Sequence, residues 1–216
     1  MEAALRIRED GVDCTITAIS VGNDSARDVL KVCVGMGADA SILVTDDQAD
    51  AADGFRVARI LAAAIRELDD VGLVLCGRQG SDYDQGLVPA VLAEELGAAF
   101  VAMAADVRLK DGVLRVKRVT PRVIETVECA TPAVVSVSNE LGQARFPTSR
   151  GLLAARKNPP TMRAAADLAV NGNGHRIELE NLLVPDVQGH CEMISGGSPA
   201  ELVTALLARL RAEGVL

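Results

Sequence analysis

Apolar and polar residues alternate in blocks along the first hundred positions of this chain. Three blocks are almost entirely apolar or β-branched, which predicts strands buried on both faces: residues 14–21, 41–45 and 71–76. Around them, apolar residues recur at intervals of three and four, which predicts helices with one buried face: residues 2–9, 25–36, 55–68 and 84–96. A first helix is therefore followed by three strand–helix pairs.

This alternation is typical of the α/β class. It predicts a doubly wound, mostly parallel sheet of the Rossmann-like, adenine-nucleotide-binding type, with right-handed crossovers and helices on both faces. The helix at 2–9 has no strand before it, although such a helix normally crosses over from one. We therefore expect either an unusual start or a chain that lacks the usual first strand–loop segment.

The pattern changes after Gly97. Residues 105–128 alternate between apolar and polar positions, and Asp111-Gly112 separates two of the runs as a favoured hairpin turn. Residues 132–138 then form another buried strand. We expect an antiparallel hairpin at 105–128 as an addition to the parallel sheet.

The last sixty residues differ from the rest. Glycine and proline interrupt residues 158–197, and a capping box with proline at the first helical position starts a helix at Ser198. Its apolar face consists of Leu202, Val203, Leu206, Leu207 and Leu210. We therefore divide the chain into an α/β nucleotide-binding domain at 1–157 and an extended C-terminal arm at 158–216 that ends in a helix.

The charge and composition exclude several classes. The chain has 216 residues, 22 Lys and Arg against 30 Asp and Glu, and only 2% aromatic residues. A net charge of −8 and few stacking side chains argue against nucleic-acid binding. We see neither a signal peptide nor an apolar run near the roughly 20 residues of a membrane helix, so we expect no membrane insertion.

The five cysteines are scattered and form no Cys-x-x-Cys pair or Cys/His cluster. We interpret them as core thiols in a reducing compartment, the bacterial cytoplasm, and expect no metal site. Neither histidine, His175 or His190, stands beside a nucleophile in the sequence. We therefore identify no catalytic set and expect no catalysis by this chain alone.

The loop after the third predicted strand is the richest candidate for ligand binding. Ligands of open parallel sheets bind beyond the carboxyl ends of the strands, and a helix N-terminus that follows can hold a phosphate. Residues 76–84 supply Arg78, two glycines, and hydroxyl and amide side chains. Asp82 and Asp84 are unexpected at an anion site, and Asp84 alternatively caps the helix. Arg78 is alternatively a solvated loop residue.

A basic window at 143–166 stands out in this acidic chain. It has five basic residues and no acidic one. It could be a solvated face, a nucleic-acid site, which the composition disfavours, or a docking segment for an acidic partner. The inset Leu152-Leu153 favours docking, because exposed apolar residues suit a protein contact better than a phosphate.

Several segments, in order and spacing, resemble the small (beta) subunit of electron transfer flavoproteins over nearly the whole chain. They are residues 34–44, 73–84, 93–97, 131–137, 144–148 and 154–157. The resemblance implies a heterodimer with a larger alpha subunit that holds most of a shared FAD. It also implies AMP, or a second FAD, in the small subunit. Electrons would arrive from a flavin dehydrogenase, often of the acyl-CoA type, and leave for a quinone oxidoreductase.

The resemblance also implies sites. The matching nucleotide positions are Val21, Gly22, Gln79, Gly80, Ser81, Asp82, Tyr83, Asp84, Gln85, Gly86, Leu87 and Val88. The matching dehydrogenase-recognition positions are Thr148, Ser149, Arg150, Leu152, Leu153, Arg156 and Lys157. The arm matches the part that embraces the alpha subunit.

The chain departs from the family pattern at both sites. Gln85-Gly86-Leu87 stands where the family has Thr and Gln side chains, so we do not expect every nucleotide hydrogen bond of the family here. Ser149 stands where the family has an anchoring leucine. Either Leu152 anchors the partner instead, or the partner is not the standard acyl-CoA dehydrogenase.

Two other functions fit the predicted fold. One is a stand-alone adenine-nucleotide-binding regulator of the universal-stress type, which shares this sheet topology but needs no long arm. The other is a nucleotide-cleaving enzyme, which would need a catalytic loop after a first strand. We favour the electron-transfer subunit and rank the regulator second.

Overall fold

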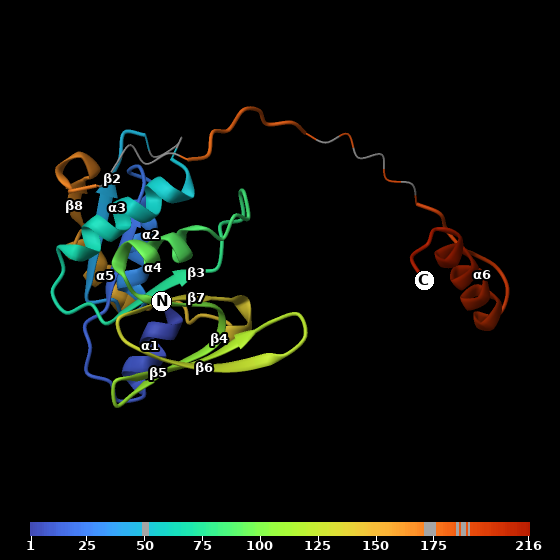
Figure 1. Ribbon diagram of the computed structural model, residues 1–216, viewed down its shortest axis with the longest axis horizontal. Helices are drawn as coiled ribbons and strands as arrows, with labels where there is room; N and C mark the ends of the chain where they lie inside the picture. Colours follow the sequence, from blue (N-terminus) through green and yellow to red (C-terminus); the bar gives the residue numbers. More distant parts are fainter. Residues whose placement is uncertain (49–51, 171–175, 185, 187–188, 190) are drawn as a thin grey trace. The chain divides into compact units, whose positions relative to one another are not determined.

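A computed structural model describes residues 1–48, 52–170, 176–184, 186, 189 and 191–216 (Figure 1). The chain divides into two compact units, Met1–Glu178 and Leu179–Leu216. The first unit extends past the boundary expected at residue 157, because the segment after it adds a strand to a sheet. The glycine-rich residues 171–174 lie outside the described residues.

The first unit is a mixed α/β fold, as predicted. One sheet has three parallel strands in the order β1 (Thr17–Val21), β2 (Ala40–Thr45) and β8 (Thr161–Ala164). The other has five strands in the order β3 (Leu73–Gly77), β7 (Ala133–Val137), β4 (Ala99–Lys110), β5 (Val113–Val119) and β6 (Ile124–Ala130). The first three of these are parallel and the last three are antiparallel, so the expected antiparallel addition is present.

The parallel strands form two sheets instead of one continuous sheet. Among the described strands, β1 pairs only with β2, and β3 pairs only with β7. Two helices nevertheless hold the sheets together. From α1 (Glu2–Glu9), Leu5 packs on the first sheet and Ile7 on the second. From α3 (Gly54–Arg66), buried side chains pack on both sheets.

Helices cover both faces of each sheet. In β2, Leu43 packs toward α1 and α2 (Ala26–Met36), while its neighbour Val44 packs toward α3. In β7, Val135 packs toward α1, while Val134 packs toward α3 and α4 (Val88–Leu96). All four side chains are fully buried, as the period of two in a strand requires when both faces are covered.

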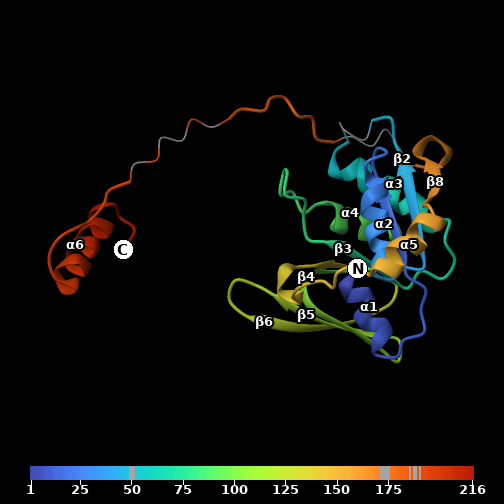
Figure 2. The ribbon, with the colours of Figure 1, turned by 180° about the vertical axis from the view of Figure 1, so that it is seen from behind.

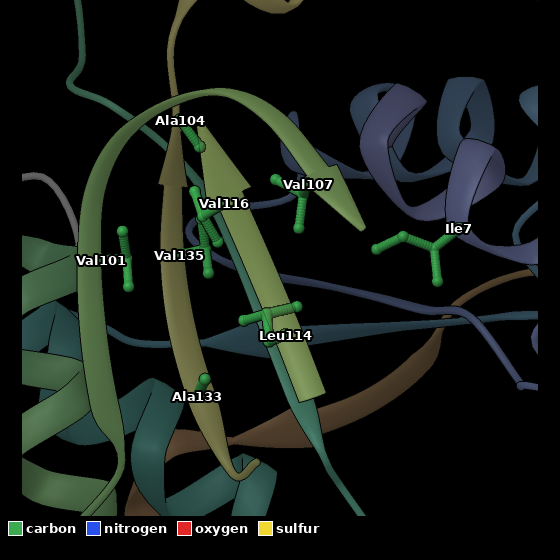
Figure 3. Packing of buried hydrophobic residues seen from close by; sticks show 8 residues of the cluster. All are labelled: Ile7, Val101, Ala104, Val107, Leu114, Val116, Ala133 and Val135. Carbon is green, nitrogen blue, oxygen red and sulfur yellow. The ribbon is translucent and has the colours of Figure 1, made fainter. Parts of the chain in front are cut away.

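The core beneath α1 lies between that helix and the second sheet. Figure 3 shows Ile7 pointing from α1 toward the strands that carry Val107, Leu114 and Val135. These side chains are at most 4% exposed. The hairpin of β4 and β5 therefore contributes to the core as well as to the surface.

Strand β4 is longer than the sequence indicated, because its two halves pair differently. Its first residues run parallel to β7, and the residues from Ala104 onward run antiparallel to β5. At the change of partner Met103 adopts a left-handed φ of 61°, and its amide donates to the Ser136 hydroxyl at 3.1 Å. Such a bulge redirects a strand and increases its twist.

Among the described residues of the second unit there is one helix, α6 (Pro199–Ala212). The predicted capping box is present: the Ser198 hydroxyl accepts from the Glu201 amide, and the Glu201 carboxylate accepts from the Ser198 amide at 2.7 Å. No residue of α6 is buried. Within the described residues, no helix combines the length and apolarity needed to cross a membrane.

Candidate functional site

The loop between β3 and α4 carries most of the residues predicted to bind a nucleotide. Residues 77–85 are exposed, and the loop protrudes from the first unit in both ribbon views (Figures 1 and 2). It follows the carboxyl end of β3 and leads directly into a helix N-terminus, as the sequence indicated. This is the position at which an open α/β sheet binds ligands.

The loop is closed by its own polar side chains. The Gln79 side-chain amide donates to the Asp84 carboxylate at 2.9 Å, and the Asp84 backbone amide donates to the Gly80 carbonyl at 3.2 Å. The Asp82 carboxylate accepts from the Tyr83 amide at 2.8 Å. The two aspartates therefore serve, at least in part, to shape the loop.

The alternative prediction that Asp84 caps the following helix is wrong. Helix α4 begins at Val88, four residues later than residue 84, and its N-cap is Leu87. Asp84 instead lies in the left-handed region at φ 51°, with its carboxylate on Gln79. A tight turn through Asp84 and Gly86 therefore precedes the helix.

These residues are of a kind that fits an adenine nucleotide. No side chain caps the first turn of α4. The backbone amide of Ala90 therefore has no intrahelical acceptor and can donate a hydrogen bond to an anionic group of a ligand. Ser81 and Gln85 are exposed and can donate to ribose, phosphate or base. Arg78 is exposed too, and it lies near Glu140, whose pKa is lowered by the Ser138 hydroxyl and also by this guanidinium.

Val21 and Gly22 lie at the end of β1, in the other sheet. The Gly22 amide donates to the Val44 carbonyl at 3.0 Å and is already used by the sheet. Among the described residues, no hydrogen bond joins Val21 or Gly22 to the loop at 79–88. The predicted nucleotide residues thus form two groups, of which the loop is the larger.

Cys76 lies near the end of β3, just before this loop, and its thiol is mostly buried. Burial raises the pKa of its thiol to about 11, which keeps the sulfur protonated near neutral pH. Among the described residues, no group of three His, Cys, Asp or Glu could hold a metal ion. His175 and His190 lie outside the described residues.

Within the predicted docking segment at 143–166, residues Ser149–Lys157 form a helix, α5, where the sequence suggested a loop. The Thr148 hydroxyl accepts from the Gly151 amide at 2.9 Å and caps it. The helix lies beside α2 (Figures 1 and 2) at a close approach of two glycines: a Cβ on Gly151 would lie 2.3 Å from the Gly35 carbonyl oxygen. Tertiary packing therefore holds a helix whose sequence alone favours it little.

The packing of α5 distinguishes the two leucines of the basic window, of which the sequence named Leu152 as the alternative anchor for a partner. Leu152 lies against Gly35, because a Cβ on Gly35 would be only 2.8 Å from the Leu152 Cδ2. The Leu152 side chain is half-buried. Leu153 is 59% exposed. Leu153 is thus available to a partner, whereas Leu152 serves the attachment of α5.

The basic residues of this window divide in the same way. Arg145 pairs with Glu2 and Glu9 of α1, and Arg163 pairs with Glu67. Three other cations are exposed and have no carboxylate within ion-pair distance among the described residues: Arg150, Arg156 and Lys157. The positive surface therefore comes from α5 itself.

Sequence reasoning missed Phe146, which is 82% exposed beside α5. It is one of three phenylalanines in the chain and lies inside the basic window. An aromatic residue in so aromatic-poor a sequence was an available signal, because exposed aromatics are enriched at protein interfaces.

Comparison with known proteins decides the family. The family model of the Electron transfer flavoprotein domain matches residues 1–168, and thus covers both the loop and α5. The chain belongs to the electron transfer flavoprotein beta subunit family. Its similarity to beta subunits of electron transfer flavoproteins extends over several organisms.

The electron transfer flavoprotein subunit beta of Mycobacterium tuberculosis is 30% identical over 177 residues, 80% of this chain and 66% of that protein. That of Megasphaera elsdenii is 30% identical over 86% of this chain and 73% of its own length. The Caffeyl-CoA reductase-Etf complex subunit CarD of Acetobacterium woodii is 27% identical over 100% of this chain and 84% of its own length. The chain thus spans 65–66% of the length of the mycobacterial relatives it matches.

Proposed function

We propose that this chain is the beta subunit of an electron-carrying flavoprotein and acts without chemistry of its own. In this role it joins an alpha subunit that holds most of a shared FAD. It supports that flavin, and it provides the surface through which the heterodimer binds flavin dehydrogenases of the acyl-CoA type or a relative. A quinone oxidoreductase of the respiratory chain receives the electrons. Membership of the family is the observation that carries this proposal.

The second unit supports an obligate partner. It exposes large apolar side chains both before and along α6, among them Leu182, Leu183, Val184, Val203 and Leu206. Exposed apolar residues at this density mark a surface that another protein covers. We infer that residues 179–216 of this chain bind the alpha subunit. The five free thiols fit a reducing compartment, which we take to be the bacterial cytoplasm.

The loop at 78–88 is the proposed nucleotide site, with AMP or a second FAD as its ligand. Support comes from its exposure, its polar side chains and the uncapped start of α4. A second FAD would supply a redox flavin beyond the carboxyl end of β3, whereas AMP would supply a structural anion there. The residues of this chain would hold it through Gln79, Ser81 and the amides of the first turn.

Co-expression with the alpha subunit tests the proposal. The pair is purified and denatured, and the released small molecules are identified by mass spectrometry. One FAD together with one AMP, or two FAD, per heterodimer is the expected result. The proposal would be contradicted if this chain were a soluble monomer that did not bind the alpha subunit and bound nucleotide by itself.

Two matched pairs of variants assign the surfaces. Leu206→Asp should weaken the heterodimer by about tenfold or more, whereas Ala208→Asp, in the same helix and also exposed, should not. Gly86→Val should reduce the bound nucleotide. Gly112→Val imposes similar backbone strain, since both glycines have positive φ, but lies at a hairpin tip with nothing within 4 Å.

A further inference from the structure

One carboxylate joins the start of α3 to the last residues of the first unit. Asp53 is 8% exposed and caps α3: its Oδ1 accepts from the Arg56 amide at 2.8 Å. Its Oδ2 accepts from the amides of Arg176 and Ile177, at 2.5 and 2.8 Å. Both oxygens therefore accept from backbone donors, and Arg176 and Ile177 lie 123 and 124 residues after Asp53 in the sequence.

A second contact holds the same segment. The guanidinium of Arg176 lies over the Phe55 ring, 5.5 Å from its centroid, in the geometry of a cation–π interaction. Phe55 belongs to the first turn of α3. Arg176 and Ile177 immediately precede Glu178, where the first unit ends. The backbone is therefore fixed just before the segment at 179–216 begins.

The nucleotide loop reaches the same helix end. Leu87, its last residue before α4, packs on Gly54: a Cβ on that glycine would lie 3.2 Å from Leu87 Cδ2 and 3.3 Å from Leu87 Cβ. Gly54 directly follows Asp53 in the chain. The start of α3 thus contacts the loop on one side and, through Asp53 and Phe55, the root of the C-terminal segment on the other.

The charge of Asp53 suits this use. The nearby guanidinium of Arg56 is bound to Asp46, with hydrogen bonds of 2.7 and 2.8 Å. Asp53 accepts hydrogen bonds from three backbone amides, those of Arg56, Arg176 and Ile177. Hydrogen bonds from amides to an ionised, buried carboxylate are among the stronger kinds.

We propose that Asp53 is a positioning residue that couples nucleotide retention at the loop to docking of the C-terminal segment. The inference rests on the proposed function, which gives both surfaces their ligands. When the alpha subunit holds residues 179–216, the Asp53 clamp keeps the start of α3 in place, and Leu87 with it. Coupling of this kind is reciprocal, so a filled nucleotide site should tighten the heterodimer by the same factor.

The substitution Asp53→Ser separates the clamp from the cap, and Asp53→Asn tests whether a single acceptor oxygen can serve both. Serine is a good N-cap and retains a hydrogen bond from Arg56, but it has one short side-chain oxygen and cannot reach Ile177. Asparagine keeps the shape with a single acceptor oxygen, so it can serve the cap or the clamp but not both. Asp111→Asn is the matched control, because it makes the same change at an exposed hairpin tip.

Trypsin tests the clamp on the chain itself, since it cleaves after Arg176. We expect Asp53→Ser to accelerate this cleavage by about a hundredfold or more, because two hydrogen bonds to a charged group are lost. The unfolding temperature of the first unit should stay close to that of the unaltered chain. Unchanged cleavage at Arg176 would overturn the clamp whether or not the proposed function holds.

The affinity for AMP, measured by calorimetry with and without the alpha subunit, tests the coupling. In the unaltered protein the alpha subunit should raise AMP affinity severalfold, and in Asp53→Ser the two affinities should be equal. A ratio that persists in Asp53→Ser would overturn the coupling. If no heterodimer forms with the unaltered chain, the proposed function and the coupling both fall, whereas the trypsin result still decides the clamp.

Discussion

Arg145 donates hydrogen bonds to Glu2 across 143 residues of sequence. Its backbone amide, Nε and Nη2 all bind the Glu2 carboxylate, at 3.1, 2.8 and 3.0 Å. The same guanidinium binds Glu9, which lies about two turns further along the same face of α1. The segment that leads into α5 is thereby fastened to the helix that bridges the two sheets.

This pair predicts an acid-sensitive contribution to stability. Hydrogen bonds from Arg145 lower the pKa of Glu2 from 4.5 to about 2. Because the folded-state pKa is depressed, the contribution is complete above pH 4.5 and is lost as the pH falls toward 2. Glu2→Gln should reduce the free energy of unfolding by about 1–3 kcal/mol at pH 7. Urea unfolding at a series of pH values measures it.

Glu9→Gln is the control, since Glu9 is exposed and should contribute less. The difference between the unaltered chain and Glu2→Gln should shrink as the pH falls from 4.5 to 2. A difference that stays constant over this range would show that the ionisation of Glu2 does not stabilise the fold.

The two-glycine contact predicts that α5 tolerates no side chain at Gly151. A Cβ there would lie 2.3 Å from the Gly35 carbonyl oxygen, so Gly151→Ala must push α5 away from α2. We expect a loss of about 1–3 kcal/mol in the free energy of unfolding, as for other overpacked contacts. Gly77→Ala is the control, because a Cβ at Gly77 meets nothing within 4 Å. Equal stability of the two variants would contradict the close contact.

The elements that the sequence predicted are those with local signals. Helices α1, α2 and α3, and the capping box of α6, follow from periodicity and capping residues within a few positions of each other. Strand β8 did not, because its Thr161–Ala164 is short and partly polar and becomes a strand only by pairing with β2. Helix α5 was missed because Gly151 disfavours a helix locally.

The candidate site was predictable only in part for the same reason. The fold class placed the exposed loop beyond β3, because ligands of parallel sheets bind at that edge. The roles of Leu152 and Leu153 were not predictable, since only the contact with Gly35 distinguishes them. The Asp53 clamp depends on residues far apart in the sequence, and no local pattern announces such a contact.

The core of the second sheet predicts a large effect at Leu114. Leu114 belongs to β5, and its side chain is fully buried in the core beneath α1 (Figure 3). Leu114→Ala should lower the free energy of unfolding by about 2–5 kcal/mol, because the cavity adds to the lost transfer free energy. Val113→Ala, at a side chain 46% exposed, should cost far less. Denaturant unfolding of both variants checks the assignment, and similar losses would contradict it.

The leucines of α5 predict a separation between partner binding and stability. If α5 docks a flavin dehydrogenase, Leu153→Ala should weaken that binding by about tenfold with little change in unfolding temperature, because Leu153 is 59% exposed. Leu152→Ala should do the reverse, because Leu152 packs on Gly35. Calorimetric titration of the dehydrogenase and thermal unfolding give the two readouts. If Leu152→Ala alone weakened binding, without loss of stability, the partner would be anchored by Leu152 and the assignment to Leu153 would be wrong.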